Sequence, residues 1–359
     1  MDDLFLSVGD LSAANYVVNI LKILQSKPQP LNISGITDKR MEALGVKSIA
    51  SIKDLNLVGI VEVLPKIFKI RKIMKRASEA ANNSRWVMLC DAPGFNFPLM
   101  KSLKHKNIIY FISPQVWAWK PHRIKDIVSY VKHLIVILPF EVDIYKPYEN
   151  EHFKVHYFGH PLLDIIKPST AKKENIIAML PGSRNSEFKR HIGLLEEVAK
   201  YIYQKYHMKS LIPVADTVDY PIYRKDYIET TKESSLEIMK RAKFGIIASG
   251  TASLEASLMG LPHIIFYRLN PITLQIAKRL VKTKYIGLPN IIMDKEIIPE
   301  LIQPSKEDII KKVSHYLENK NSIEQMKENL GLLREKLYKE NATQRIADFI
   351  YEVVTEDIF

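Results

Sequence analysis

One carboxylate stands directly after a short apolar run, where a buried strand is expected to end. The run covers Trp86–Cys90, and Asp91 opens the loop Asp91-Ala92-Pro93-Gly94-Phe95-Asn96 that follows it. A carboxylate at the carboxyl end of a buried strand can face a ligand and serve as a general base. The same acid could instead cap the next helix or stabilise a turn. The sequence leaves both roles open for Asp91.

A later loop carries the small residues and the cation that bind phosphate groups. It reads Leu180-Pro181-Gly182-Ser183-Arg184 and opens a helical pattern. Glycine lets the backbone approach a ligand closely, N–H groups at the helix start favour an anion, and Arg184 can clamp that anion. The second glycine and the Gly-Lys-Ser/Thr element of a Walker A loop are missing. A purely structural loop is the alternative.

The segment Ala248-Ser249-Gly250-Thr251-Ala252 repeats this arrangement after another strand-like run. Three consecutive N–H groups at a helix start near Ala252, with the hydroxyl groups of Ser249 and Thr251, could hold a diphosphate. Glu255 follows about one turn later. Its carboxylate could accept hydrogen bonds from ribose hydroxyls, or could only place a favourable charge near the helix N-terminus.

Aromatic and polar residues follow three other strand-like runs. Trp117 and Trp119 lie close to cationic side chains. Rings with cations can hold sugar faces or acyl chains, but they can equally fill a domain interface. Arg268 and Asn290 add polar groups at two further strand ends.

The elements that must position these residues alternate between strands and helices. In the first half, the predicted strands are Leu4–Val8, Asn32–Ile36, Trp86–Cys90, Ile108–Ile112 and His133–Leu138. The predicted helices are Leu11–Leu24, Leu64–Ala81, Arg123–Val131 and Phe140–Tyr148. Such alternation is typical of parallel βαβ units, whose ligands bind beyond the carboxyl ends of the strands.

The same rhythm restarts in the second half, after a linker rich in Pro, Gly and charge near 159–174. The predicted strands are Ile176–Leu180, Lys209–Val214, Phe244–Ala248 and His263–Tyr267, and the predicted helices are Phe188–Tyr206, Ser253–Leu258 and Pro271–Val281. From Ser305 the chain reads as helical and highly charged, with Asn341 as a cap or joint. We therefore predict an α/β fold of two Rossmann-like, doubly wound domains with a cleft between them. Domain boundaries are expected at 1–165 and 166–335, with a helical tail over 336–359 that packs back on the first domain or on a partner subunit.

Composition narrows the classes of partner. Among 359 residues, 52 Lys and Arg outnumber 40 Asp and Glu, which suits an anionic partner such as a membrane surface or a phosphorylated substrate. Nucleic acid is not expected, because no nucleic-acid-binding signature is present. The single cysteine, Cys90, excludes an intrachain disulfide and a cysteine-based zinc site, and the histidines have no metal-binding spacing. We see no signal peptide and no stretch of about 18 apolar residues, so we expect a cytoplasmic protein.

A basic amphipathic stretch covers residues 64–81. It puts Ile67, Ile70, Met74 and Ala77 on one face and at least six cations on the others. This pattern fits a helix that lies on an anionic membrane. An ordinary surface helix with its apolar side inward is the alternative.

Taken together, these segments resemble the lipid-A-disaccharide synthases, the family-19 glycosyltransferases of Gram-negative outer-membrane assembly. The resemblance covers residues 4–303, and no single motif carries it. The order and spacing of the following motifs do: GIVEVL (59–64), DAP (91–93), SP (113–114) with VWAW (116–119), LPFE (138–141), GHP (159–161), LPGSR (180–184), ASGTA (248–252), AKRLVKT (277–283) and LPN (288–290).

The resemblance implies a GT-B fold with an acceptor-side first domain and a UDP-sugar-binding second domain. It implies transfer of 2,3-diacylglucosamine from its UDP ester to 2,3-diacylglucosamine 1-phosphate (lipid X), giving the β-1,6-linked disaccharide 1-phosphate and UDP. It further implies inversion at the anomeric carbon, no cofactor or catalytic metal, a peripheral position on the inner face of the inner membrane, and a homodimer as one arrangement.

The resemblance also assigns roles to residues. Asp91 matches the family's essential acid, and Arg184, Glu255 and Asn290 match residues on the UDP side. Ser183, Ser249, Gly250, Thr251 and Arg268 lie in or beside the same motifs.

The acceptor and acyl side is assigned Asp10, Ser12, Trp117 and Trp119. Two departures stand out. Gly9-Asp10-Leu11-Ser12-Ala13-Ala14 replaces the family's GExSGD loop, and Gly94 replaces the second acid of its DAPDFN motif. The loss of that second acid favours Asp91 as the base.

Two other functions remain open at this stage. One is a related GT-B enzyme that uses a different lipid acceptor or epimerises a UDP-sugar. The other is a non-catalytic homologue that only binds nucleotide or membrane. A turnover assay with both acylated substrates distinguishes them.

Overall fold

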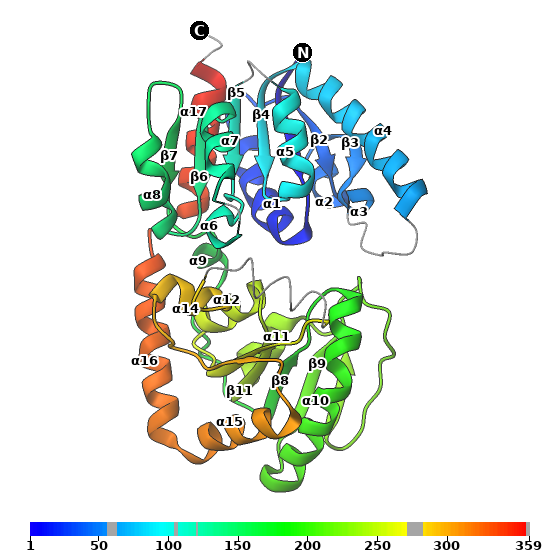
Figure 1. Ribbon diagram of the computed structural model, residues 1–359, viewed down its shortest axis with the longest axis vertical. Coiled ribbons are helices and arrows are strands. Elements are labelled where there is room, and N and C mark those ends of the chain that lie inside the picture. Colours follow the sequence, from blue (N-terminus) through cyan, green and yellow to red (C-terminus); the bar gives the residue numbers. More distant parts are fainter. Residues whose placement is uncertain (56–62, 104–106, 120, 271–282, 357–359) are drawn as a thin grey trace. The chain divides into compact units, whose positions relative to one another are not determined.

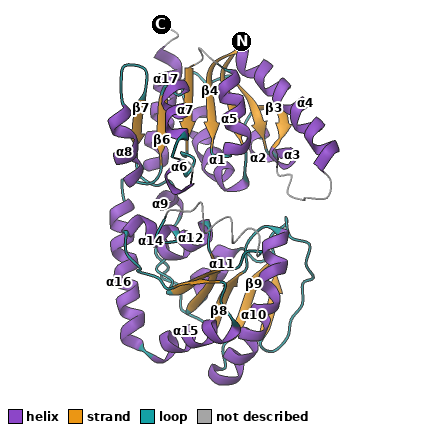
Figure 2. Cartoon of the chain, in the orientation of Figure 1, coloured by secondary structure: helices purple, strands orange, loops and turns teal. Residues whose placement is uncertain are grey.

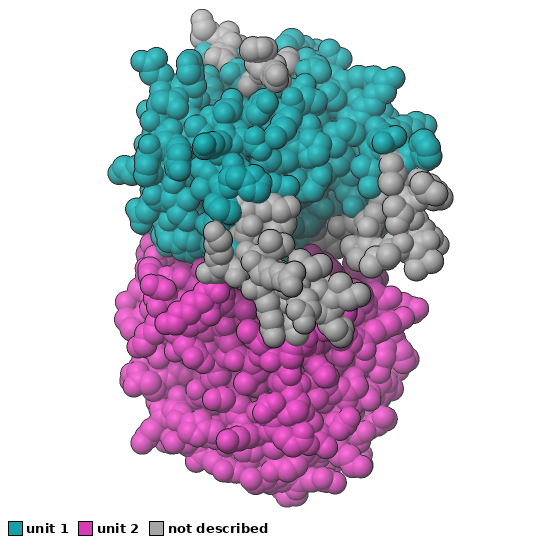
Figure 3. All heavy atoms as spheres, viewed as in Figure 1, with its two compact units in different colours: residues 1–164, 339–359 teal, residues 165–338 magenta. Residues whose placement is uncertain are grey.

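The chain divides into two units, each built on its own parallel β-sheet. The computed structural model describes residues 1–55, 63–103, 107–119, 121–270 and 283–356, and of these the side chains of residues 11, 63–67 and 119 lie outside the description. One unit combines residues 1–164 with 339–359, and the other covers 165–338 (Figure 3). The changes of unit lie next to the domain boundaries expected from the sequence.

The first unit is organised around a sheet with the strand order β3-β2-β1-β4-β5-β6-β7 in its described residues. All the pairings in this sheet are parallel. The central strands are almost completely buried because helices lie along the sheet (Figures 1 and 2), which is why they read as continuous apolar runs. The strands are β1 (Asp2–Val8), β2 (Ile33–Thr37), β3 (Lys47–Ser51), β4 (Ser84–Cys90), β5 (Asn107–Phe111), β6 (His133–Val136) and β7 (Lys154–Tyr157).

Most helices of this unit lie between successive strands, as parallel pairing requires, whereas α9 leads to the second unit and α17 ends the chain. They are α1 (Leu11–Gln25), α2 (Lys39–Glu42), α3 (Ile52–Leu55), α4 (Val63–Asn82), α5 (Pro93–Ser102), α6 (Val116–Trp119), α7 (Arg123–Tyr130), α8 (Phe140–Tyr145), η1 (Lys146–Tyr148), α9 (Leu162–Ile165) and α17 (Ala342–Glu356).

The second unit repeats this plan with the strand order β10-β9-β8-β11-β12-β13 in its described residues. Its strands are β8 (Ile176–Leu180), β9 (Lys209–Pro213), β10 (Ile228–Thr231), β11 (Phe244–Ala248), β12 (His263–Tyr267) and β13 (Glu300–Ile302). Its helices are α10 (Asn185–Tyr206), α11 (Ser235–Arg241), α12 (Thr251–Leu258), α14 (Leu288–Met293), α15 (Lys306–Glu318) and α16 (Lys320–Leu337). Side chains from β8, β11, β12 and α10 form its core.

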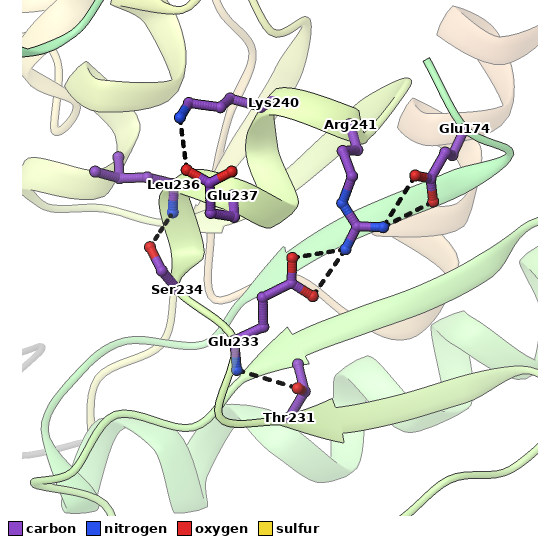
Figure 4. Close-up of polar contacts among 8 residues, drawn as sticks. All are labelled: Glu174, Thr231, Glu233, Ser234, Leu236, Glu237, Lys240 and Arg241. Atoms are coloured by element: carbon purple, nitrogen blue, oxygen red, sulfur yellow. Dashed lines mark hydrogen bonds and ion pairs between the residues drawn. The ribbon is translucent and has the colours of Figure 1, made fainter. Parts of the chain in front are cut away.

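Arg241 of α11 fastens the start of the second unit. Its guanidinium donates to both oxygens of Glu174 at 3.0 and 2.8 Å, and to both oxygens of Glu233 at 2.7 Å (Figure 4). The Lys173 Nζ and Ser169 Oγ atoms both donate to the carbonyl oxygen of Lys240. The segment that follows α9 is therefore held along its length by the second unit.

The C-terminal helix α17 belongs to the first unit. It packs against α1, and Lys27, two residues after the end of α1, forms an ion pair with Asp348 at 2.5 Å. The ring of Phe349 lies 4.4 Å from that of His156, between ring centroids. Asn341, which the sequence predicts as a joint, has φ of +55° and lies between α16 and α17.

The strands that the sequence analysis did not predict share one property. β3, β7, β10 and β13 are the edge strands of the two sheets. Edge strands carry polar side chains because one side of each meets solvent, so they lack the apolar run of a buried strand. The predicted helix Pro271–Val281 falls outside the described residues.

Candidate active site

In the first unit, the loops after four neighbouring strands lie side by side. The parallel register pairs Val8 with Cys90 and Cys90 with Phe111, so β1, β4 and β5 end at the same edge of the sheet. β6 follows in the same sheet. This edge carries Asp10, Asp91, the segment Ser113–Trp117 and Glu141, in that order across the sheet.

The backbone at Asp91 is strained and firmly held. Asp91 and Ala92 have φ of +46° and +44°, a region that costs non-glycine residues about 1–3 kcal/mol each. The Asp91 carbonyl oxygen accepts hydrogen bonds from Tyr110 Oη at 2.7 Å and Asn96 Nδ2 at 2.8 Å. The cap position of α5 is taken by Ala92, which has no side-chain oxygen. Asp91 is therefore not the N-cap residue of this helix, and its half-buried side chain stands at the strand end.

Asn96 is a site residue whose role the sequence analysis missed. It is fully buried, and its Nδ2 atom also donates to the carbonyl oxygen of Cys90 at 3.1 Å. Its Oδ1 atom accepts from Ser7 Oγ at 2.6 Å, which joins β1 to the loop after β4. Its place in the motif that begins with Asp91 was the available signal, but the motif gave no reason to expect burial.

Asp10 lies near Asp91 but is engaged in the fold. It is the N-cap residue of α1, and its Oδ1 atom accepts from the backbone N–H of Ala13 at 2.7 Å. A Cβ atom on Gly9 would overlap Ala92, so only glycine allows these two loops to approach so closely. Burial raises the pKa of the Cys90 thiol, and the charges of Asp91 and Asp10 add to this effect. Both carboxylates therefore lie close to Cys90.

The other predicted acceptor-side residues differ in their surroundings. Ser12 is exposed on the first turn of α1. Trp117 is half-buried; its Nε1 atom donates to Glu141 Oε1 at 3.2 Å, and its ring lies edge-on to Phe140 with centroids 5.0 Å apart. The side chain of Trp119 lies outside the described part of the chain.

In the second unit, the loops after β8, β11 and β12 lie side by side, because these strands are neighbours in the sheet. Gly182 has φ of +110°, and a Cβ atom there would come within 2.9 Å of Glu187 Oε2. Arg184 is the N-cap residue of α10, and its exposed guanidinium bonds Glu187 Oε1 at 3.0 Å. Ser183 is exposed, and its carbonyl oxygen accepts from Thr217 Oγ1 at 2.6 Å.

The start of α12 presents backbone N–H groups and one hydroxyl group. Gly250 is the N-cap residue and Thr251 the first helical residue. The first N–H groups of a helix have no partner within the helix, and they make its N-terminus attractive to an anion. Thr251 Oγ1 makes no hydrogen bond with any described residue. Ser249 Oγ, in contrast, donates its proton to the carbonyl oxygen of Ile286 at 2.9 Å. In this arrangement the Ser249 hydroxyl is engaged with the backbone, and its predicted bond to a phosphate would require it to leave Ile286.

Glu255 lies one turn inside α12, and Arg268 directly follows β12. The Glu255 carboxylate has no side-chain hydrogen bond within the described residues, and burial raises its pKa. At Arg268, the backbone is held by His191, whose Nε2 atom accepts from the Arg268 N–H at 3.3 Å. His191 Nδ1 donates to the carbonyl oxygen of Pro181 at 2.7 Å, so this buried imidazole links the loops after β8 and β12. The sequence gave no signal for His191.

Asn290 corrects the predicted site. It is fully buried, and its Nδ2 atom donates to the Ile298 carbonyl and to Glu300 Oε1, each at 2.7 Å. Its Oδ1 atom accepts from the N–H groups of Ile297 at 2.8 Å and Ile298 at 3.0 Å. Because an amide offers two donors and two acceptor positions, none is left for a ligand. Asn290 therefore holds backbone rather than UDP.

Glu300, which the sequence analysis did not single out, completes this support. Its two oxygens accept from the N–H groups of Ile286 at 2.7 Å and Gly287 at 2.9 Å. Ile286 in turn accepts the Ser249 hydroxyl. The segment before α14 is thus tied to the loop after β11.

The basic helix α4 packs one side against the first unit and exposes its cations. Ile73, Ala77 and Ala81 are buried against the unit, while Ile70 and Met74 are half-buried. The predicted apolar face, which included Ile67, is thus centred one position away, and the Ile67 side chain is outside the description. Phe68 is 68% exposed, beside the exposed cations Lys69, Arg71, Lys72, Lys75 and Arg76. In the described ranges, no helix has both the length and the apolar character needed to cross a membrane.

The candidate residues thus form two sets. Asp10, Asp91, Trp117 and Glu141 lie at the strand ends of the first unit. Ser183, Arg184, Thr251, Glu255 and Arg268 lie at those of the second unit.

Solved structures similar to the chain share its fold at low sequence identity. A UDP-GlcNAc 2-epimerase from Neisseria meningitidis, bound to UDP-GlcNAc, superimposes with a TM-score of 0.65 at 12% identity, covering 97% of this chain and 99% of the other. The calicheamicin glycosyltransferase gives a TM-score of 0.60 at 11% identity, covering 99% and 98%. The fold is therefore that of the GT-B enzymes, as predicted, with two Rossmann-like domains and a helical C-terminal region.

Relatives of higher identity identify the family. The lipid-A-disaccharide synthase of Aquifex aeolicus is 40% identical over 366 residues, covering 99% of this chain and all 100% of the relative. That of a Sulfurihydrogenibium species is 39% identical over 383 residues, covering 98% of each. The profile described as lipid-A-disaccharide synthetase matches residues 4–352. The chain therefore belongs to the lipid-A-disaccharide synthase family and is a glycosyltransferase of lipid A disaccharide formation.

Proposed function

We propose that the chain transfers 2,3-diacylglucosamine from its UDP ester to the 6-hydroxyl of 2,3-diacylglucosamine 1-phosphate, with Asp91 as the base. The observation that carries this proposal is the strained Asp91–Ala92 backbone, held by Tyr110 and Asn96 at a strand end. Strain of this kind persists where the surrounding structure fixes a residue for function.

In the proposed step, the Asp91 carboxylate takes the proton of the acceptor 6-hydroxyl. The acceptor oxygen forms a bond to the anomeric carbon while the bond from that carbon to the UDP oxygen breaks. Attack from the face opposite the leaving group inverts the anomeric centre and gives the β-1,6 linkage. A positioned base contributes roughly 10²–10⁴ in rate.

The second unit is proposed to receive the leaving UDP. The N-terminus of α12 and the Thr251 hydroxyl would hold its diphosphate, and Arg184 would exchange its bond to Glu187 for a phosphate oxygen. Glu255 would accept hydrogen bonds from the ribose hydroxyls, which would compensate for the burial of its carboxylate. Arg268 would add a cation at the next strand end.

Because both substrates are lipids, we propose that α4 binds the membrane that contains them. We propose that exposed Phe68 and the surrounding cations place the protein on the inner face of the inner membrane, where the acyl chains reside. Sedimentation with anionic and with neutral vesicles tests this: anionic vesicles should bind more protein, and Phe68→Ser should reduce that binding. The proposal includes a homodimer as one possible arrangement of the chain.

The decisive assay incubates purified protein with UDP-2,3-diacylglucosamine and lipid X and weighs the products by mass spectrometry. The proposal predicts a disaccharide 1-phosphate and one UDP for each disaccharide formed. A UDP-sugar of unchanged mass and altered retention, formed without lipid X, would indicate an epimerase. UDP binding with no product from either substrate would indicate a non-catalytic homologue.

A further inference from the structure

Glu141 is a buried carboxyl group that the proposed reaction does not use. It is 1% exposed and lies on α8, directly after the loop that follows β6. Its Oε1 atom accepts the indole N–H of Trp117 at 3.2 Å, and its Oε2 atom accepts the backbone N–H of Leu138 at 3.3 Å. Burying a carboxyl group is costly, so its place here needs a reason.

A second side chain of the same short helix holds the same loop. The Tyr145 hydroxyl, one turn after Glu141, is hydrogen-bonded to Ser113 Oγ at 2.8 Å, and both residues are buried. Ser113 lies in the turn that follows β5, and Trp117 lies in α6, the short helix that this turn leads into. α8 therefore fixes this segment at two points, and the turn lies next to the loop of Asp91 because β4 and β5 are paired.

We propose that Glu141 is a positioning residue for the acceptor: its carboxyl group fixes the Trp117 indole beside Asp91, so that the half-buried ring forms a wall of the acceptor-sugar or acyl-chain subsite. This rests on the proposed function, in which Asp91 activates the acceptor. A tryptophan ring whose N–H is engaged is held in one orientation, and the apolar faces of such a ring suit the face of a sugar or an acyl chain.

The protonation of Glu141 gives this arrangement a measurable signature. Burial raises the pKa of Glu141 to about 8; the bonds from Trp117 and Leu138 lower it, and the negative charge of Asp91 raises it further. The titratable groups that face Glu141 are Asp91 from the loop after β4 and Tyr145 from its own helix. At neutral pH the carboxyl group is therefore mainly uncharged, and it ionises under the indole as the pH rises past about 8.

Fluorine NMR of protein labelled with 5-fluorotryptophan measures the ionisation of Glu141 beside the indole, independently of turnover. Trp117→Phe assigns one of the three resonances. We expect the Trp117 resonance to shift with a midpoint near pH 8 in wild type and in the control Asp143→Asn, an exposed acid on the same helix, and not to shift in Glu141→Gln. Asp91→Asn should move the midpoint to lower pH, because it removes a negative charge. A Trp117 resonance with the same titration in Glu141→Gln would overturn the proposal.

A kinetic double-mutant cycle tests the role in positioning. Glu141→Leu and Trp117→Phe should each lower kcat/KM for lipid X about 10- to 100-fold, mainly through KM, and the double variant should be no worse than the poorer single one. Glu141→Gln, which keeps an acceptor for the indole, should retain at least about ten times the kcat/KM of Glu141→Leu. UDP affinity, measured by calorimetry, should stay within about twofold in all of them. Slow labelling of the buried Cys90 thiol, as in wild type, shows that the first unit is folded.

The opposite results refute the proposal. Effects of Glu141→Leu and Trp117→Phe that multiply would show that Glu141 does not act through the indole. The NMR titration distinguishes a failure of this proposal from a failure of the proposed function. If Asp91→Asn remains active, Asp91 is not the base. The titration of Glu141 seen at Trp117 does not depend on that result.

Discussion

At the scale of single residues, the site is built from side chains that hold the backbone of others. Asn96 and Tyr110 bond the Asp91 carbonyl, and His191 bonds the backbone at Pro181 and Arg268. Such residues touch no proposed substrate atom, and their value lies in fixed geometry. Of these residues only Asn96 lies in a sequence motif, and that motif does not show which of its side chains face the ligand.

A substitution at Asn290 tests whether this side chain supports the backbone or binds UDP. Asn290→Ala removes four hydrogen bonds and leaves the N–H groups of Ile297 and Ile298 buried without partners. We expect the free energy of unfolding to fall by about 2–4 kcal/mol, measured by urea titration, and UDP binding to weaken only as a consequence.

Asn290→Asp serves as its companion variant. It places a second carboxylate against Glu300, so its destabilisation should be larger at pH 8 than at pH 5, where protonation relieves the repulsion. Unchanged stability of Asn290→Ala, together with a large loss of UDP affinity, would instead restore the direct contact predicted from the sequence.

At the scale of helices and strands, the sequence predicts an element correctly where burial determines the pattern of apolar residues. β8, β11 and β12 have the predicted bounds, because buried parallel strands are continuous apolar runs. The four edge strands were not predicted, since their polar side chains resemble loop sequence. The motif loops were placed correctly after strands. A motif does not show, however, that the Ser249 hydroxyl donates its hydrogen bond to the Ile286 carbonyl oxygen. That contact joins residues 37 positions apart and depends on tertiary structure.

The start of α12 makes a prediction at this scale. Thr251→Val removes a hydroxyl group that has no described partner in the fold, so the free energy of unfolding should change by less than about 0.5 kcal/mol. UDP should bind about 10- to 100-fold more weakly, as expected for the loss of a hydrogen bond to a charged group. Isothermal calorimetry measures the affinity. Thr251→Ser, which keeps the hydroxyl, is the matched control, and equal affinities for the Val and Ser variants would contradict the assignment.

At the scale of the whole molecule, the chain enters the first unit twice. Residues 339–359 return to it after the second unit is complete, and α17 packs on α1. The sequence analysis offered this packing and a partner subunit as alternatives for the tail, because a charged amphipathic helix does not indicate which surface covers its apolar side. The position of the last helix therefore depends on tertiary contacts that its own sequence pattern does not show.

The tail should stabilise the first unit alone. Ile350→Ala removes a fully buried side chain of α17 and should cost about 2 kcal/mol or more. Cys90, the single cysteine, is fully buried in β4, so its reaction with a thiol reagent reports opening of the first unit. We expect the labelling rate to rise about 30-fold. Ile309→Ala, at a fully buried position in the second unit, should leave that rate unchanged, and an equal rise would show that the units unfold together.

The most direct measurement on the whole account is the turnover of Asp91→Asn with UDP-2,3-diacylglucosamine and lipid X, paired with its UDP affinity. Asparagine keeps the shape of the side chain and cannot take the proton, so kcat should fall by at least about 100-fold while UDP binds within about twofold of wild type. A variant that retains more than about a tenth of the wild-type kcat would show that another group is the base.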